Sequence, residues 1–492
     1  MRTISFQLNN KGKIFYVILG IILLIASAFG AYVLKSYGYI GGIIPLVLSF
    51  GILFVYAVLR LPRFGVLALL VMSYFIMFII SIAVTEFPLG TLMDGMLALL
   101  VIGFFIQQKY YRNFSVFNNP ISYLILGWIV YNLIQVFNPN AASQLAWIYT
   151  IRSVAVIMLS YFIFTYYIIS IDFVKLIIKV WLALSVFAAI YAMKQEYIGF
   201  FAFEERDHFD PLIQSLLYID GHWRKNAIFS DPVAFSYNMV VSSLLCIGLI
   251  TGPLQLKKKI ILGALVFLFL FVMLFSGTRA AYVLIPAAGL LLIIIKLNKS
   301  LFIASIIGAM GFFAIINVPT GNVTLYRFQS AFKPNNDASY NVRKANQKRI
   351  QPYIQSHPIG GGLGATGIWG KRFAPNSFLA QIPPDSGYLR VGMELGWIGL
   401  FFICTIMFTG LYMGIKNYFN MRDPQLKSIC FAMVLIVFAI AIANFPQEAI
   451  VQFPLNVFFY LFLALIHVTK VLDDKKYNEE HGIIKKEIKI IE

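Results

Sequence analysis

Charged and hydroxyl side chains interrupt the apolar chain in two segments that adjoin long apolar runs. Arg224 lies in His-Trp-Arg-Lys, shortly before Phe-Ser-Asp231-Pro. Asp before Pro commonly starts a helix, and Arg224 could contact either lipid headgroups or an anionic substrate. Ser276-Gly-Thr-Arg279 separates two apolar runs. Arg279 therefore either snorkels to the membrane interface or acts as an anion ligand at a broken helix.

A second group of candidates begins with Arg343 and Arg349 and leads to a glycine-rich run. His357 opens this run, His-Pro-Ile-Gly-Gly-Gly-Leu-Gly. The run lacks the Lys-Ser/Thr end of a P-loop, so close backbone packing or a reentrant turn is favoured over a nucleotide site. For His357 a structural hydrogen bond is favoured over catalysis.

The third group, Asp385 to Glu394, surrounds the start of another apolar run. Asp385 either caps the helix or contacts a substrate. Arg390 and Glu394 follow with i, i+4 spacing, which allows them to satisfy each other as an ion pair on a buried helix face.

Several familiar sites are missing from the sequence. It contains no HExxH, no GxSxG, no metal-spaced His/Cys cluster and no DxD pair in its polar loops. The three cysteines lie inside apolar runs, so no disulfide framework is expected. The sequence therefore predicts neither a metal nor a cofactor.

The candidate groups must be positioned by membrane helices. The 492 residues are 60% hydrophobic and 12% charged, about half the charge of soluble domains, which excludes a water-soluble globule. We expect an all-α integral membrane protein, a polytopic bundle of about 12–14 transmembrane helices with a large extracytoplasmic loop. The fourteen candidate spans begin near residues 14, 39, 64, 91, 120, 153, 174, 233, 260, 280, 300, 386, 428 and 450.

Basic residues predict the orientation of these helices. In short loops they concentrate on one side, which places both termini in the cytoplasm. This bias accounts for most of the net charge of +18 without a nucleic-acid partner. We expect one transmembrane domain, residues 1–469, with outer segments 195–230 and 319–385, and a cytoplasmic tail, residues 470–492.

Together, these motifs resemble the O-antigen ligase and O-antigen polymerase superfamily of bacterial envelope glycosyltransferases, with GT-C-like architecture. The resemblance covers residues 224–400 and rests on the order and spacing of the pieces. The pieces are Arg224 with Phe229-x-x-Pro232, the break Ser276 to Arg279, Arg343 fourteen positions before His357, Tyr388-Leu389, and Glu394 to Gly399. Many members carry His-Asn before Tyr-Leu, and that His is their proposed base. Here Asp385-Ser386-Gly387 takes its place.

The resemblance implies metal-independent glycan transfer at the periplasmic face of a bacterial inner membrane. The donor would be a glycan on a polyprenyl (undecaprenyl) diphosphate and the acceptor a sugar hydroxyl, on lipid A-core or a similar molecule, within membrane lipids. Arg279 and Arg343 would clamp the diphosphate, and Asp385 would receive the hydroxyl proton or position the hydroxyl. Arg224 and Arg349 would assist this clamp in binding the diphosphate. Supporting roles would fall to Asp231, His357, Tyr388, Arg390 and Glu394.

Three alternatives remain open at the level of sequence. A repeat-unit polymerase would use the same donor-binding residues as a ligase. A flippase or transporter of lipid-linked sugars would need ionisable groups near the midplane and two similar halves. The sequence shows one lysine in mid-span, Lys179, and no clear half-repeat. A non-catalytic envelope scaffold would leave the ordered outer arginines unexplained.

Overall fold

A computed structural model describes residues 50–82, 90–111, 114–152, 157–205, 210–219, 221–296, 299–321, 323–332 and 338–482, together with Ser27 and Val154. The chain divides into two compact units, Met1–Gly65 and Val66–Glu492. In the first unit an apolar helix covers Phe50–Arg60. The span expected near residue 14, most of the span expected near residue 39, and the tail beyond residue 482 lie outside the described residues.

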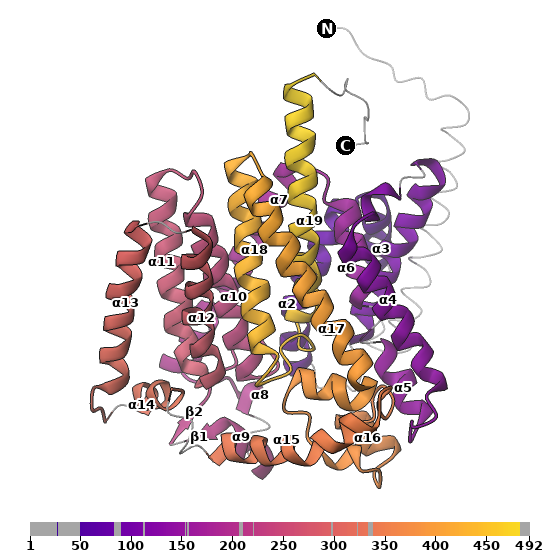
Figure 1. The fold of residues 1–492 in the computed structure, drawn as a ribbon, viewed down its shortest axis with the longest axis vertical. Coiled ribbons are helices and arrows are strands. Elements are labelled where there is room, and N and C mark those ends of the chain that lie inside the picture. The colour runs from indigo at the N-terminus through magenta and orange to yellow at the C-terminus, as the bar shows by residue number, and fades with distance from the viewer. Residues whose placement is uncertain are drawn as a thin grey trace. The chain divides into compact units, whose positions relative to one another are not determined.

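From Pro62, where α2 begins shortly before the second unit, the described residues are almost entirely helical (Figure 1). The helices are Pro62–Ile82 (α2), Gly90–Tyr111 (α3), Pro120–Ile134 (α4), Gln144–Ile151 (α5), Ile157–Tyr167 (α6), Ile171–Tyr197 (α7), Ala202–Glu205 (α8), Pro211–Leu217 (α9), Pro232–Ile250 (α10), Leu256–Met273 (α11), Arg279–Lys296 (α12), Lys299–Asn317 (α13), Val323–Ser330 (α14), Ala338–Ser356 (α15), Gly367–Phe373 (α16), Gly387–Asn420 (α17), Pro424–Ala443 (α18) and Leu455–Glu480 (α19). Two strands, Tyr218–Ile219 (β1) and His222–Trp223 (β2), form a small antiparallel hairpin.

Ten helices among the described residues are long and apolar enough to cross a membrane. They are α2, α3, α4, α7, α10, α11, α12, α17, α18 and α19. Each coincides with an expected span, so the prediction of an all-α polytopic membrane protein is confirmed. The spans expected near residues 153 and 300 correspond to α6 and α13. As described, α6 has 11 residues, which is too short to cross about 30 Å of hydrocarbon by itself.

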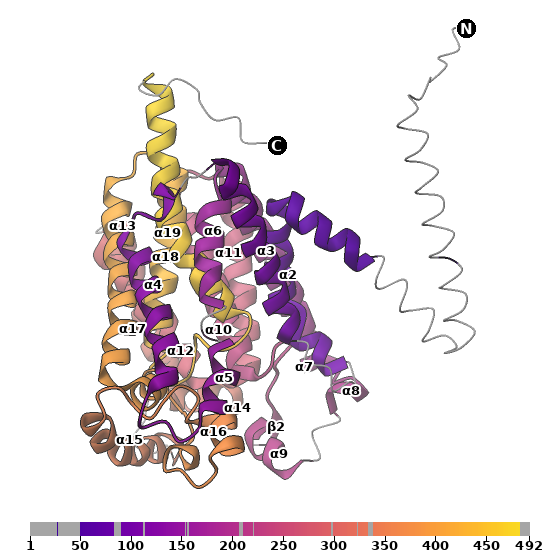
Figure 2. The ribbon, with the colours of Figure 1, turned by 90° about the vertical axis from the view of Figure 1, so that its right-hand side faces the viewer.

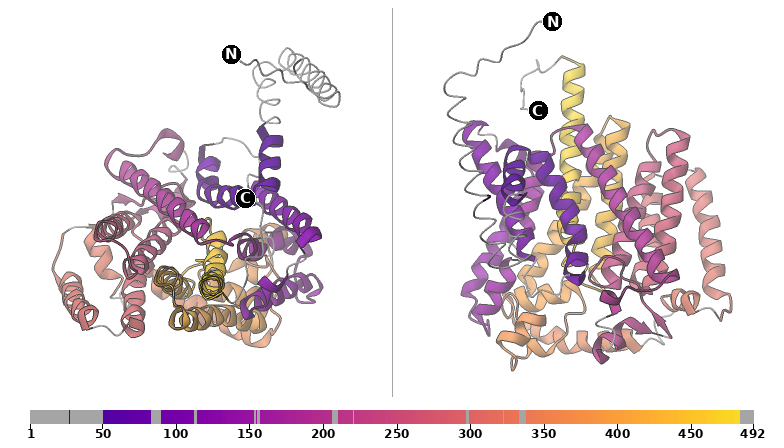
Figure 3. Two further views of the ribbon diagram at one scale, coloured as in Figure 1. Left: turned by 90° about the horizontal axis from the view of Figure 1, so that it is seen from above. Right: turned by 180° about the vertical axis from the view of Figure 1, so that it is seen from behind.

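Helices α10, α18 and α19 form the core of the bundle. Their apolar windows are 78%, 78% and 83% buried, whereas those of α11 and α12 are each 28% buried. Seen from above, α19 in yellow is surrounded by other helices (Figure 3). A helix that is apolar on all sides suits such a central position. Helix α19 continues to Glu480, so the first part of the expected tail is helical.

The glycine-rich run packs against a kink in α17. At Gly396 the backbone has φ +69° and ψ −172°, which is not helical. Gly361 and Gly362 donate their backbone N–H groups to Met393 O and Glu394 O, both at 2.9 Å. A Cβ on Gly360 would lie 2.5 Å from the Glu394 carbonyl, so only glycine permits this approach. The expected close backbone packing is confirmed.

Both long polar segments lie at the same end of the second unit. The hairpin with α8 and α9 belongs to the first segment, and α14, α15 and α16 belong to the second (Figures 1 and 2). This arrangement brings motifs far apart in the sequence to one end of the bundle.

Candidate functional site

The expected break between two apolar runs is present and has a defined structure. A 3₁₀ turn, Leu274–Ser276, ends at Gly277, which has φ +57°, and α12 begins at Arg279. Thr278 donates its backbone N–H to Ser276 Oγ at 3.1 Å. The Thr278 hydroxyl donates to Pro232 O at 3.2 Å. The break is therefore tied to the start of α10.

Asp231 caps α10. Its Oδ1 accepts the backbone N–H groups of Val233 at 2.8 Å and Ala234 at 3.0 Å, and Ser230 Oγ donates to its Oδ2 at 2.8 Å. The helix-start interpretation of Asp231 is confirmed. The carboxylate also lies close enough to Arg224 to act on it electrostatically.

Arg224 connects the first outer segment to the helix break. Nε donates to Ser276 O at 2.7 Å, Nη2 to Thr278 Oγ1 at 3.1 Å, and Nη1 to Leu216 O at 3.2 Å. Burial lowers the pKa of the Arg224 guanidinium to about 10, and the positive charge of Arg327 acts in the same direction, whereas Asp231 opposes it. Arg224 thus fixes the loop while adding positive charge to the break.

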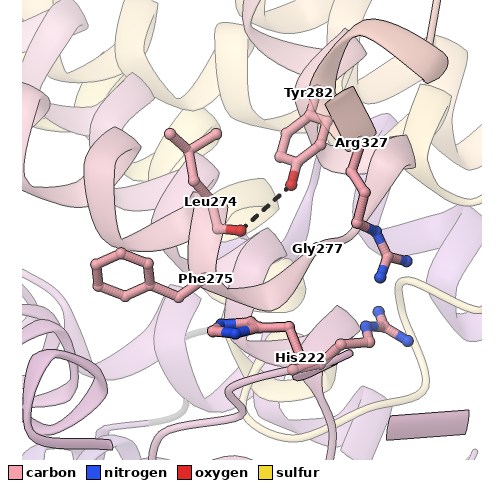
Figure 4. Close-up of a pocket in the computed structure, with 7 residues that line it drawn as sticks. His222, Leu274, Phe275, Gly277, Tyr282 and Arg327 are labelled. Atoms are coloured by element: carbon pink, nitrogen blue, oxygen red, sulfur yellow. Dashed lines mark hydrogen bonds between the residues drawn. The ribbon is translucent and has the colours of Figure 1, made fainter. Parts of the chain in front are cut away.

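A small pocket lies beside the break and contains an arginine that the sequence motifs do not indicate. Its lining consists of His222, Arg224, Leu274, Phe275, Gly277, Tyr282 and Arg327 (Figure 4). Arg327 comes from α14 and is 8% exposed. The sequence gives only a weak indication of its role, because it belongs to no motif and is one of several basic residues in 319–385. Arg279 is also near, since it acts electrostatically on Arg224 and on Tyr282.

Arg343 and Asn346 lie close together on helix α15. The i, i+3 spacing puts them on one helix face, which continues to the buried Ile350. Arg343 lies close enough to Tyr237 of α10 to act on it electrostatically, as does Asp231. Arg343 thus approaches the start of α10, although it does not line the pocket.

Asp385 lies beside α15 rather than capping α17. Asn346 Nδ2 donates to Asp385 Oδ2 at 3.3 Å. Ser386 is the N-cap, and its side chain accepts from Leu389 N. The capping alternative for Asp385 is therefore wrong, because the helix starts one residue later than that alternative requires.

Arg390 and Glu394 form the expected buried ion pair, and a third residue joins them. Arg390 Nε lies 3.2 Å from Glu394 Oε1, and Nη1 lies 3.1 Å from Glu448 Oε2. Thr366 also donates its hydroxyl to Glu394. Burial raises the pKa of the Glu448 carboxyl, Arg390 opposes this rise, and Glu394 and Asp385 add to it. No sequence motif points to Glu448, which lies in the loop between α18 and α19.

Three further candidates make contacts typical of structural residues. The Tyr388 hydroxyl donates to Ala441 O at 2.8 Å. The ring of His357 stacks on Tyr353 at 4.0 Å, and its Nδ1 lies 3.0 Å from Tyr353 O. The Arg349 guanidinium lies over the Phe378 ring at 5.4 Å. None of the three lines the pocket beside the break.

The described part of the chain contains no group of three or more His, Cys, Asp or Glu side chains placed to hold a metal ion. The chemistry that these residues can offer is that of guanidinium groups and carboxylates. Such groups bind anions through charge-assisted hydrogen bonds and orient hydroxyl groups.

Comparison with known proteins identifies a family domain in the same region. Residues 264–404 match the family model described as O-Antigen ligase. The match runs from α11 into α17 and includes Arg279, Arg327, Arg343 and Asp385. The resemblance to the O-antigen ligase and polymerase superfamily is confirmed, and the match supports a membrane enzyme of this type. A search of curated proteins finds no match.

Proposed function

We propose that this membrane enzyme of O-antigen ligase type transfers a glycan from a polyprenyl-diphosphate carrier to a sugar hydroxyl. The reaction would take place at the periplasmic face of a bacterial inner membrane. The observation that carries the proposal is the convergence of Arg224 and Arg279 at the helix break, inside or beside the segment that matches the family.

The chemistry of the leaving group explains why arginines should gather here. When the acceptor oxygen attacks the anomeric carbon, the bond from that carbon to the diphosphate oxygen breaks, and the carrier diphosphate leaves with the electron pair. Negative charge therefore grows on the diphosphate in the transition state. Guanidinium groups stabilise such charge through paired N–H donors, without a metal ion or a proton transfer to the leaving group.

The individual residues divide this work. Arg279, at the start of α12, and Arg343, on α15, would grip the diphosphate. Arg224 would hold the loop at the break and add charge, and Arg349 would support the arginines that bind the diphosphate. The polyprenyl chain would lie along the apolar helices, since the start of α12 adjoins their apolar surface.

Asp385 would act on the acceptor. Its hydrogen bond with Asn346 fixes one carboxylate oxygen, which leaves the other to orient the hydroxyl and to receive its proton. The start of α17, which follows Asp385, would be held in place by the ion pairs of Arg390 with Glu394 and Glu448.

In vitro transfer tests the proposal directly. The purified chain in vesicles is supplied with a polyprenyl-diphosphate glycan, a sugar acceptor and EDTA. We expect transfer in the presence of the chelator, reduced by about 100-fold or more in Arg279→Ala. Arg372→Ala, an exposed arginine of α16, is the matched control. Near-normal transfer by Arg279→Ala at equal protein level would reject the clamp.

The same site would serve a repeat-unit polymerase, and a deletion strain separates the two. Loss of a ligase leaves long chains on the carrier lipid, whereas loss of a polymerase leaves single repeats on the surface. We expect the first result. Movement of labelled lipid-linked sugar across vesicles without any transfer would instead identify a flippase.

A further inference from the structure

The position of Arg327 deepens the proposed function, on which the following inference rests. We propose that Arg327 is a direct ligand of the donor diphosphate, and that α14 serves to hold it at the helix break. This assigns a binding role to a residue outside the recognised motifs and makes α14 part of the donor site.

Helix α14 is fastened by the residues that follow Arg327. Gln329 Nε2 donates to Ile315 O at 2.8 Å and to Val318 O at 2.7 Å, at the end of α13. The ring of Phe328 packs against Tyr282 of α12, with 5.2 Å between ring centroids. Two consecutive side chains thus fix a helix of eight residues against its neighbours, and the Arg327 side chain before them reaches Gly277 at the break.

The Arg327 side chain lies directly over the backbone of the break. A Cβ added to Gly277 would be 3.3 Å from both Cζ and Nε of Arg327. Gly277 therefore meets two demands, a φ of +57° and the close approach of a guanidinium. Figure 4 shows Arg327 beside Gly277 and Tyr282 in the pocket.

Burial distinguishes Arg327 from an arginine that contacts lipid headgroups. A snorkelling arginine extends its charged end into the interface, whereas Arg327 is 8% exposed. Its charge faces another cation, because Arg327 and Arg224 line the same pocket and act on each other. Holding two guanidinium groups together costs free energy. Asp231 offsets part of this cost at Arg224, and an anion bound between the two guanidinium groups would offset more of it.

The size of the pocket limits what enters it. Its volume is about 20 Å³, which is close to the space for one water molecule. One phosphate oxygen, rather than a whole diphosphate, fits between Arg224 and Arg327. The remainder of the headgroup would lie outside the pocket, toward Arg279.

A binding experiment separates this role from catalysis. The full chain in phosphatidylcholine nanodiscs is titrated with farnesyl diphosphate, which carries no glycan to transfer, and its affinity is measured by calorimetry. We expect Arg327→Gln to bind about tenfold or more weakly, and Arg327→Lys to bind with intermediate affinity because it keeps the charge but loses the paired donors. Arg372→Gln is the matched control and should bind like the unchanged protein.

Each result is informative. Unchanged affinity in Arg327→Gln, while the unchanged protein binds and transfers, would overturn the role of Arg327 and leave the proposed function intact. If Arg327→Gln does not fold, Arg327→Lys decides, and equal affinity there overturns the role as well. Absence of binding by the unchanged protein would refute the diphosphate site itself. The titration is repeated with the chain in nanodiscs that contain phosphatidylglycerol. If phosphatidylglycerol displaces farnesyl diphosphate there, the pocket binds a lipid headgroup and the inference is overturned.

Discussion

Arg224 Nη2 and Thr278 Oγ1 lie 3.1 Å apart, although 54 positions separate the two residues in the sequence. The Thr278 hydroxyl donates in turn to Pro232 O, and Lys225 N donates to Phe275 O at 3.0 Å. The loop before α10 and the break before α12 are therefore one structural unit. The positive charge of the break depends on both.

Because the loop and the break form one unit, we predict that lysine cannot replace Arg224 without loss of transfer activity. An ammonium group cannot reproduce three donors directed at Ser276 O, Leu216 O and Thr278 Oγ1. Loss of charge-assisted hydrogen bonds at about 1.5–3 kcal/mol each should lower transfer by about tenfold or more in Arg224→Lys. Transfer by purified protein at matched amounts measures this. Thr278→Ser, which keeps the hydroxyl, should remain near normal, and a fully active Arg224→Lys would refute the role of the three guanidinium donors.

Asp385 is expected to contribute more by positioning than by taking a proton. In Asp385→Asn the new amide oxygen would still accept the bond from Asn346, so we predict a loss of about tenfold or less. Asp385→Ala removes the hydrogen bond and should lose about 100-fold. Transfer rates at saturating donor compare the two variants. Equal, severe losses in both would mean that proton acceptance dominates, since general base catalysis contributes about 10²–10⁴-fold.

Gly396 is predicted to be indispensable for the fold around the site. Its φ of +69° and ψ of −172° suit glycine alone, and a Cβ there would overlap the carbonyl oxygen of Pro358. Gly396→Ala should destabilise the protein by about 3 kcal/mol or more and reduce its level in membranes. Thermal unfolding in detergent tests this. Gly263→Ala in α11 is the control, because nothing lies within 4 Å of its added Cβ; equal stability of the two variants would contradict the prediction.

Asp423 should make stability depend on acidic pH. It caps α18 through Gln425 N and Leu426 N, and Lys476 bonds its other oxygen. Burial raises the pKa of Asp423, but the bonds from Lys476 and the backbone outweigh it and lower the pKa below its ordinary value. Because the folded pKa is depressed, this stability is present above about pH 4 and is lost as pH falls through the folded value.

Comparison of Asp423→Asn with the unchanged protein measures this contribution. Asparagine still caps the helix but carries no charge for Lys476, so at pH 7 the variant should unfold at a slightly lower temperature than the unchanged protein. The difference should shrink as the solution is acidified below the ordinary pKa of an aspartate. A difference that stays constant with pH would show that the charge of Asp423 adds nothing.

The sequence could predict the spans because each depends on local composition. About 20 consecutive apolar residues are needed to cross hydrocarbon, and this requirement can be recognised without knowing any neighbour. The helix cap at Asp231, the break at Ser276–Arg279 and the pair Arg390–Glu394 were predictable for the same reason. In each case the interacting groups lie within a few positions of one another along the chain.

Arg327 and Glu448 could not be found in this way. Arg327 gains its significance from Arg224, which lies in the loop before α10, and Glu448 from Arg390, which is 58 positions away. Asp385 is a candidate from its sequence motif, but its partner, Asn346, belongs to a helix that sequence patterns did not connect with it. Composition and periodicity decide which segments are helices and which side chains are unusual in an apolar chain. Only tertiary packing decides which of those side chains meet, because burial and Coulomb interactions depend on distance in space and not on separation along the sequence.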